Sequence, residues 1–353
     1  MFTRAIRALR QYSYWFLPPQ GDGHEWAALS ERIGRRDDVF FTLHRRPREA
    51  SGVGTVADPW APHPRTGIVL QGPLLLDHNF TLETIKVYRR HFPDDPVILS
   101  TWKGEQANVI ESCRKAGAIV VQSEDPENPG PSNINRQIVS SRAGMEKCRE
   151  LGLGHALKTR TDQRFYFPNA LSALHALLRQ FPLRIECAQR QRLVGVSLNT
   201  LRFRRYGLSD MFLFGETEDM TRYWSCDVDS RRDVAPAPFG AHAELRLGEV
   251  WFETEFLQSL GRPLAWTVED SWKAFAEHFC VVDASSIDLF WAKYDAHREY
   301  RRLTYGEMTT GQELTFRDWL TLYGGRWHAD ASLEHSRELD WNEAVLPPEA
   351  GEK

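Results

Sequence analysis

Between residues 67 and 162 the chain alternates short apolar runs with segments of helical periodicity, and this alternation limits the possible folds most. Strands are predicted at Ile68–Leu70, Val97–Ser100, Ala118–Val121 and His155–Thr161. Apolar residues at helical spacing fill the intervals 81–92, 105–116 and 132–151. Short connections between such elements are typical of βαβ units. The sequence therefore predicts a doubly wound α/β domain, with a mostly parallel sheet and helices on both faces.

In sheets of this kind ligands bind beyond the carboxyl ends of the strands. The residues that follow the first two predicted strands are therefore candidate substrate-binding residues. They are Gln71, Gly72, Pro73 and Trp102. Neither GxGxxG nor GxxxxGK[ST] follows a strand, which disfavours a dinucleotide-binding oxidoreductase and a P-loop hydrolase.

The segment 158–164, KTRTDQR, is the most informative local motif. A strand period of two places Lys158, Arg160 and Asp162 on one face. Ionisable groups on an interior strand are costly to bury unless they are paired. One interpretation is an anion site, in which Lys158, Arg160 and Arg164 bind phosphate and Asp162 binds a divalent cation that bridges it. The alternative is a salt-bridge ladder on an edge strand.

A second group of polar residues opens the long helix predicted from Ser132. Asn133 and Gln137 are four positions apart and share a helix face, and Arg136 lies near it. Free amides and the helix dipole attract anions at a helix N-terminus, so this group is a candidate phosphate or sugar contact. Simple capping by Ser132 and Asn133 explains the same residues equally well.

Two later acids are candidate catalytic residues. Asp210 precedes the apolar run 211–214, where it either caps a turn or faces a pocket. Glu249 heads a helix with an apolar face, where the helix dipole alone would also favour an acid.

Composition excludes several classes of protein. Lysine plus arginine number 44 against 48 acids, a net charge of -4, which indicates no nucleic-acid partner. The cysteines at 113, 148, 187, 226 and 280 form no CxxC pair, which favours reduced thiols in a cytosol-like compartment. HExxH is absent, which disfavours a zinc hydrolase, and no apolar stretch is long enough for a transmembrane helix.

The first 17 residues predict a short amphipathic helix. Its basic strip consists of Arg4, Arg7 and Arg10, and apolar residues such as Phe2 and Ile6 lie at helical spacing beside it. Such a helix can lie on an anionic membrane surface, or it can dock on the protein's own core. We therefore expect a cytoplasmic protein. If the first interpretation holds, it is peripheral at the inner face of the inner membrane.

Several motifs in this chain occur together and in a defined order. They are Ile68–Pro73 (IVLQGP), Ile98–Trp102 (ILSTW), Asn133–Gln137 (NINRQ), Lys158–Arg164 (KTRTDQR), Ser209–Gly215 (SDMFLFG) and Trp291–Tyr294 (WAKY). In these motifs the chain resembles the WavE-type lipopolysaccharide synthesis proteins of bacteria. The resemblance spans about residues 66–322 and implies a glycosyltransferase with a GT-A-like α/β domain.

The resemblance also implies roles for particular residues. GT-A enzymes hold a nucleotide on their first βαβ units and bind a divalent metal through an Asp-x-Asp motif. Asp162 matches that motif, but Arg164 stands in place of the second acid. Either Mg²⁺ or Mn²⁺ is held by Asp162 together with waters and diphosphate oxygens, or Arg160 and Arg164 neutralise the leaving diphosphate without metal.

The function implied is transfer of a sugar from a nucleotide-diphosphate donor to a growing lipopolysaccharide, O-antigen or capsule acceptor, a glycolipid or polysaccharide. Glu249 best matches the general base of an inverting enzyme, and Asp210 is the other candidate. A non-catalytic subunit that binds polysaccharide or a partner enzyme is the alternative. A sugar-phosphate nucleotidyltransferase is less favoured, because Gln71–Leu75 lacks a basic glycine-rich loop.

These observations predict three regions. Residues 1–65 form an N-terminal extension, residues 66–330 the GT-A-like domain, and residues 331–353 a polar tail. Within the domain, residues 281–325 are expected to add mostly helices, from the patterns at Leu289–Tyr300 and Phe316–Tyr323.

Overall fold

A computed structural model describes residues 46–53, 63–234, 243, 245–292 and 313–326. The chain divides after Pro47, and the fold described here belongs to the unit that begins at Arg48. The predicted N-terminal amphipathic helix and the polar tail lie outside the described residues. Among the described residues, no helix has the length and apolar character needed to cross a membrane.

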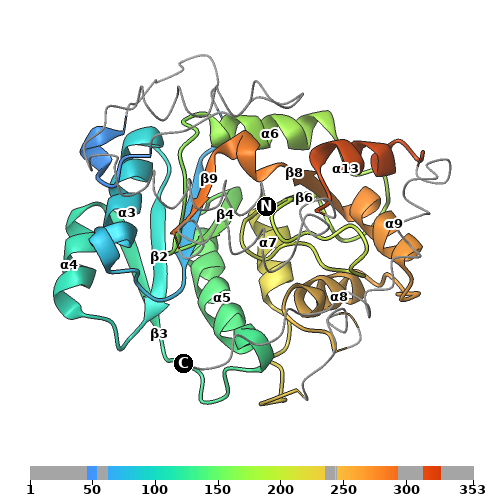
Figure 1. Cartoon of the computed structure of the whole chain (residues 1–353), viewed down its shortest axis with the longest axis horizontal. Coiled ribbons are helices and arrows are strands. Elements are labelled where there is room, and N and C mark those ends of the chain that lie inside the picture. Colours follow the sequence, from blue (N-terminus) through green and yellow to red (C-terminus); the bar gives the residue numbers. More distant parts are fainter. Residues whose placement is uncertain (1–45, 54–62, 235–242, 244, 293–312, 327–353) are drawn as a thin grey trace, which may run out of the picture. The chain divides into compact units, whose positions relative to one another are not determined.

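A seven-stranded sheet forms the centre of the described fold, in the order β3-β2-β1-β4-β7-β6-β8 (Figure 1). The strands are β1 (Thr66–Gln71), β2 (Val97–Trp102), β3 (Ala118–Ser123), β4 (His155–Arg160), β6 (Leu193–Val196), β7 (Leu213–Glu216) and β8 (Phe279–Val282). Neighbouring strands are parallel except where β7 pairs with β4 and β6. The first four predicted strands and the mostly parallel sheet are confirmed.

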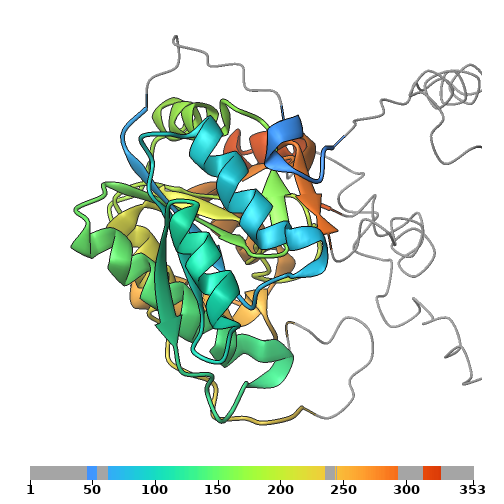
Figure 2. The ribbon, with the colours of Figure 1, turned by 90° about the vertical axis from the view of Figure 1, so that its left-hand side faces the viewer.

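Helices cover both faces of the sheet, as predicted. The α-helices are α3 (Phe80–His91), α4 (Ala107–Lys115), α5 (Ile134–Glu150), α6 (Ala170–Gln180), α7 (Thr217–Trp224), α8 (Glu249–Ser259), α9 (Val268–His278) and α13 (Phe316–Tyr323). Short 3-10 helices are η1 (Ala50–Gly52), η2 (Asp77–Asn79), η3 (Pro131–Asn133) and η4 (Ala284–Ile287). Helices α3 and α4 lie side by side near β2 and β3 (Figure 2).

The alternation of side chains along β1 and β4 shows which helices pack on which face. On one face, His175 of α6 hydrogen-bonds Thr66 at 2.9 Å, and its ring packs edge-on against Phe214 at 4.9 Å. On the other face, α5 approaches so closely that a Cβ on Gly144 would lie 2.4 Å from Val69 Cγ1. Thr66 and Val69 have opposite parity on β1, so the two helices cover opposite faces.

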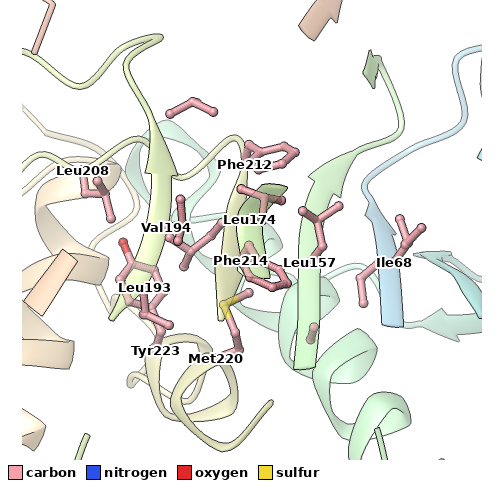
Figure 3. Packing of buried hydrophobic residues seen from close by; sticks show 14 of the residues in the cluster. Ile68, Leu157, Leu174, Leu193, Val194, Leu208, Phe212, Phe214, Met220 and Tyr223 are labelled. Carbon is pink, nitrogen blue, oxygen red and sulfur yellow. The ribbon is translucent and has the colours of Figure 1, made fainter. Parts of the chain in front are cut away.

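The hydrophobic core fills both layers between sheet and helices. Figure 3 shows Leu157 and Phe214 beside Leu174 of α6, while Met220 and Tyr223 of α7 lie on the other side of the sheet. These side chains are all fully buried. Such complete burial on both faces explains why the strands are continuous apolar runs rather than alternating ones.

The C-terminal part departs from the prediction in one place. Leu289–Trp291, expected to begin a helix, is strand β9, which pairs antiparallel with β5 (Gln163–Phe165) in a separate two-stranded sheet. Aromatic residues favour strands where a partner strand is available, and β5 supplies that partner. Residues 293–300 of the predicted helix lie outside the described residues. The predicted helix Phe316–Tyr323 is confirmed as α13 and begins with a capping box from Thr315 and Asp318.

Candidate active site

The carboxyl ends of β1, β2 and β4 meet at one edge of the sheet. Gln71 pairs in register with Ser100 of β2 and with Arg160 of β4. Gly72 follows with a φ of 121°, a conformation that residues with a Cβ rarely adopt. The Thr161 backbone N–H donates to the Gln71 carbonyl at 3.1 Å, so the chain segments beyond β1 and β4 remain joined there. The structure therefore brings the predicted residues of these strand ends together.

Arg160 and Asp162 form a two-point ion pair at this edge. Arg160 Nε donates to Asp162 Oδ1 at 2.9 Å, and Arg160 Nη2 donates to Oδ2 at 3.0 Å. Trp291 Nε1 also donates to Asp162 Oδ2 at 3.1 Å, and the Arg160 guanidinium lies 5.7 Å from the centre of the Trp291 ring. The side chains of Arg160 and Asp162 are 26% and 15% exposed, so the pair is partly shielded from water but accessible.

Arg164 lies elsewhere, because β4 ends at Arg160 and the chain turns before β5 begins at Gln163. Its guanidinium is fully buried, donating to Thr84 Oγ1 at 2.9 Å and to the Phe80 carbonyl at 3.0 Å, both on α3. It also lies 4.4 Å from the centre of the Phe80 ring. This arrangement attaches α3 to the second sheet, so we no longer propose Arg164 as a phosphate ligand.

Lys158 is also fully buried, on the face of β4 that α7 covers. Its ammonium donates to the Asp210 carbonyl and lies 4.8 Å from the centre of the Trp224 ring. Burial lowers the pKa of Lys158 to about 8, against the opposing effect of the nearby Asp210 carboxylate. Lys158 therefore does not reach the surface, and we assign it a positioning role toward the segment around Asp210 rather than direct substrate binding.

Glu249 begins α8, as predicted, and its carboxyl group is almost completely buried. Asn199 Nδ2 donates to Oε1, and Arg204 Nη1 lies 3.7 Å from Oε2. Burial raises the pKa of Glu249 to about 7, and the Arg204 guanidinium partly offsets this increase. A carboxyl group with this pKa can accept a proton near neutral pH, which is what a general base requires.

The Glu249 and Asp210 carboxylates both act on the buried Lys158 ammonium, as does Asp162. Asp210 is 4% exposed and lies in the loop that precedes β7. The candidate bases and Asp162 therefore all act electrostatically on one buried cation. Asp210 and Glu249 come from segments that lie far from Lys158 and Asp162 in the sequence.

The residues at the start of α5 are engaged with one another. Arg136 donates to both carboxylate oxygens of Asp125, at 2.8 and 2.7 Å, and to Asn133 Oδ1 at 3.1 Å. Asn133 has a left-handed backbone conformation and makes no side-chain capping bond, so the capping interpretation is wrong for this residue. Asn133 occupies the N-cap position of α5 without a side-chain bond, and Ser132 lies within η3 and is not the N-cap.

Two amide side chains near the same strand end have buried oxygens without a partner among the described residues. They are Gln71 Oε1 and Gln137 Oε1. Gln71 Nε2 donates to Ser140 Oγ at 2.8 Å, which fixes the side chain against α5. Trp102, the last residue of β2, is half-buried, and Pro73 is exposed. These residues remain candidate substrate contacts.

Sequence reasoning missed several residues of this site. Asn199 and Arg204 hold the Glu249 carboxyl group, and Trp291, quoted only as part of a motif, holds Asp162. Arg204 and Asn199 lie in the segment between β6 and β7, which has no periodic pattern. The left-handed φ of 66° at Asn199 is a property that asparagine tolerates better than most residues, but the sequence does not show it.

The resemblance to GT-A enzymes implies a divalent metal, and the side chains near Asp162 show whether they could bind one. In the described part of the chain, no three His, Cys, Asp or Glu side chains are grouped so that they could hold a metal ion. At this strand edge Asp162 is the acid that matches the metal motif, and both of its oxygens accept hydrogen bonds from Arg160 or Trp291. The arrangement of Asp162 therefore does not fit a protein-built metal site.

The buried Glu253 carboxyl group should make the thermal stability of the protein depend on pH. Its Oε2 accepts from the Leu208 backbone N–H at 2.7 Å, and burial raises its pKa to about 8. Between the usual carboxyl pKa and about 8, the unfolded chain has lost this proton while the folded protein keeps it, so stability falls as pH rises. We expect the melting temperature to decrease over this range and to decrease less in Glu253→Gln. An equal pH slope in both proteins, measured by differential scanning fluorimetry, would contradict the assignment.

Comparison with known proteins identifies the family. The model of the WavE lipopolysaccharide synthesis family matches residues 66–337, and the chain belongs to that family. The sequence resemblance is therefore confirmed. A search of curated proteins gave no match.

Solved structures that overlap with this fold include sugar-processing enzymes. A mannosyltransferase from Pyrobaculum calidifontis, in complex with GDP-Man and Mn²⁺, is 12% identical, with 79% of this chain and 91% of that chain covered and a TM-score of 0.32. The mannosyltransferase Ktr4p from S. cerevisiae is 8% identical over 78% and 82% of the two chains, with a TM-score of 0.30. A glucose-1-phosphate thymidylyltransferase from Bacillus anthracis is 10% identical over 55% and 83%, also with a TM-score of 0.30.

Proposed function

We propose that the protein is a glycosyltransferase that moves a sugar from a nucleotide-diphosphate donor to a lipopolysaccharide, O-antigen or capsule acceptor. Membership of a lipopolysaccharide synthesis family supports an acceptor of this kind. The observation that carries the proposal is that a buried carboxyl group, Glu249, and an accessible guanidinium, Arg160, both act electrostatically on the same buried ammonium, Lys158. Sugar transfer needs one group that accepts a proton and another that neutralises a leaving phosphate.

In this mechanism the donor diphosphate lies beyond the carboxyl ends of β1 and β4. Glu249 accepts the proton of an acceptor hydroxyl as its oxygen forms a bond with the anomeric carbon. The bond between that carbon and the diphosphate oxygen breaks, and its electron pair leaves with the diphosphate. Arg160 neutralises the charge that develops there. Attack from the side opposite to the leaving group inverts the anomeric configuration.

A non-catalytic subunit that binds polysaccharide or a partner enzyme is the second candidate. It is favoured by the position of Asp162, which pairs with Arg160 instead of belonging to a carboxylate cluster. The position of the Glu249 carboxyl group favours the enzyme instead, because Asn199 and Arg204 hold it where it acts on the same Lys158 ammonium as Asp162, and transfer needs a positioned proton acceptor.

Mass spectrometry with a panel of nucleotide sugars and a lipid-linked acceptor fraction tests the proposal directly. We expect the mass of one sugar to be added to the acceptor, or slow hydrolysis of one donor when acceptor is absent. Binding of polysaccharide without turnover of any donor, with or without Mn²⁺, would favour the non-catalytic subunit.

The predicted N-terminal helix gives a separate test of membrane association. Removal of residues 1–17 takes away the Arg4, Arg7 and Arg10 strip, so we expect weaker co-sedimentation with anionic vesicles. Melting temperature should stay the same, because the described fold begins after this segment. Unchanged co-sedimentation would remove the proposed peripheral membrane role.

A further inference from the structure

We propose that Arg160 binds the donor diphosphate without a divalent metal, and that Asp162 and Trp291 are positioning residues for Arg160. This inference rests on the proposed transferase function and concerns how the same site neutralises its leaving group. The Asp162 carboxylate is the group that would otherwise be assigned to a metal. Both of its oxygens instead accept hydrogen bonds from Arg160 or Trp291.

Asp162 is arranged to orient a guanidinium. Its oxygens accept from Arg160 Nε and Nη2 at 2.9 and 3.0 Å, the parallel geometry in which a carboxylate and a guanidinium fix each other's plane. Trp291 Nε1 donates to Oδ2 at 3.1 Å and so fixes the carboxylate in turn. A metal bound to Asp162 would have to compete with these donors, and the chain offers an arginine at 164 where a second acid would help.

The location of Arg160 suits a diphosphate. Arg160 is the last residue of β4, in register with Gln71 at the end of β1, beside the Gly72 turn. Its side chain is 26% exposed, whereas the other basic groups of the motif, Lys158 and Arg164, are fully buried. The planar shape of a guanidinium matches phosphate oxygens.

The two buried basic residues of the motif, Lys158 and Arg164, are engaged in contacts within the fold. Arg164 donates to Thr84 and Phe80, and Lys158 donates to the Asp210 carbonyl. Both are therefore used to hold the fold around the site. Of the cations in the motif, Arg160 is the one that lies at the accessible strand end. The delocalised positive charge of Arg160 there performs the task that a metal performs in an Asp-x-Asp site.

Isothermal titration calorimetry tests this inference with UDP, GDP and inorganic pyrophosphate as probes, each in EDTA and in MnCl₂. We expect at least one probe to bind with dissociation constants that agree within about threefold in the two buffers, about 0.6 kcal/mol. Arg160→Ala should weaken that binding by roughly 10- to 100-fold, the usual effect of losing a charged hydrogen-bond partner. Arg160→Lys should restore part of the loss, because it keeps the charge without the planar fork.

Two further variants separate this mechanism from metal binding. Asp162→Asn should weaken binding by roughly 3- to 10-fold, and equally in EDTA and in MnCl₂, because it loosens the orientation of Arg160 and removes no metal ligand. Arg190→Ala is the matched control. Arg190 forms an exposed ion pair with Glu216. Glu216 pairs with His155, the first residue of β4, whereas Arg160 is the last, so Arg190 lies at the other end of the strand. It should bind all probes like the natural protein.

The outcomes that overturn the inference are distinct from failure of the transferase proposal. Binding that appears only with Mn²⁺ and disappears in Asp162→Asn would make Asp162 a metal ligand, while leaving a transferase intact. Absence of binding for every probe in both buffers would also overturn it. The transferase proposal itself is decided by the mass spectrometry of transfer.

Discussion

Glu249→Gln should lower the turnover number of sugar transfer by about 10²- to 10⁴-fold, the range that a positioned general base contributes. An amide has nearly the shape of the carboxyl group but cannot accept the acceptor's proton. Asn199 and Arg204 should still hold the side chain, so the fold and donor affinity are expected to stay the same. Steady-state kinetics together with calorimetric donor binding measures both quantities.

The matched control for this variant is Glu253→Gln, one turn further along α8. Glu253 is also buried and also has a raised pKa, but its carboxylate holds the Leu208 backbone. We expect Glu253→Gln to keep its turnover. Full activity of Glu249→Gln together with an inactive Asp210→Asn would assign the base to Asp210. Activity in both variants would exclude an inverting mechanism of this design.

The pH profile gives an independent check on Glu249. Its pKa is raised to about 7, and a base acts only when deprotonated, so kcat/KM should fall as pH decreases through about 7. The acidic limb should be absent from the residual activity of Glu249→Gln. A limb near the usual carboxyl pKa would indicate that the working base is an exposed acid.

Gly144→Val should destabilise the fold by about 3 kcal/mol, near the upper end of the usual cost of overpacking. Even a Cβ at this position would lie 2.4 Å from Val69 Cγ1 and 3.5 Å from Ser100 Cβ. Val69 is β-branched and lies in a central strand, so it has little freedom to move. Because α5 also holds Gln71 through Ser140, its displacement should disturb the strand end that carries the site.

Thermal unfolding measures this effect, and a decrease of roughly 6–12 °C in the melting temperature corresponds to it for a large domain. Gly104→Val is the control, since nothing lies within 4 Å of a Cβ at Gly104. We expect its melting temperature to be close to that of the natural protein. Equal melting temperatures for the two variants would show that α5 and β1 are not closely packed at Gly144.

Much of the α/β architecture was predictable because its determinants are local. The apolar runs of β1 to β4 and the helical periodicity between them follow from the sequence order, and short connections then require parallel strands. The position of Glu249 at the start of α8 was predictable for the same reason. The extra strand β9 was not, since Leu289–Trp291 becomes a strand by pairing with β5, a partner more than a hundred residues away in the sequence.

The family, the order of the first strands and helices, and the charged residues available for chemistry could all be inferred from the amino-acid order. Which of those charges lie at the site depends on the folded structure. Lys158, Arg160 and Arg164 look alike in the motif, yet the turn after β4 directs Arg164 toward α3 and leaves Arg160 at the accessible edge. Side-chain alternation predicts a direction only while the strand continues. Burial, which sets the pKa of Glu249, depends on residues brought from distant segments.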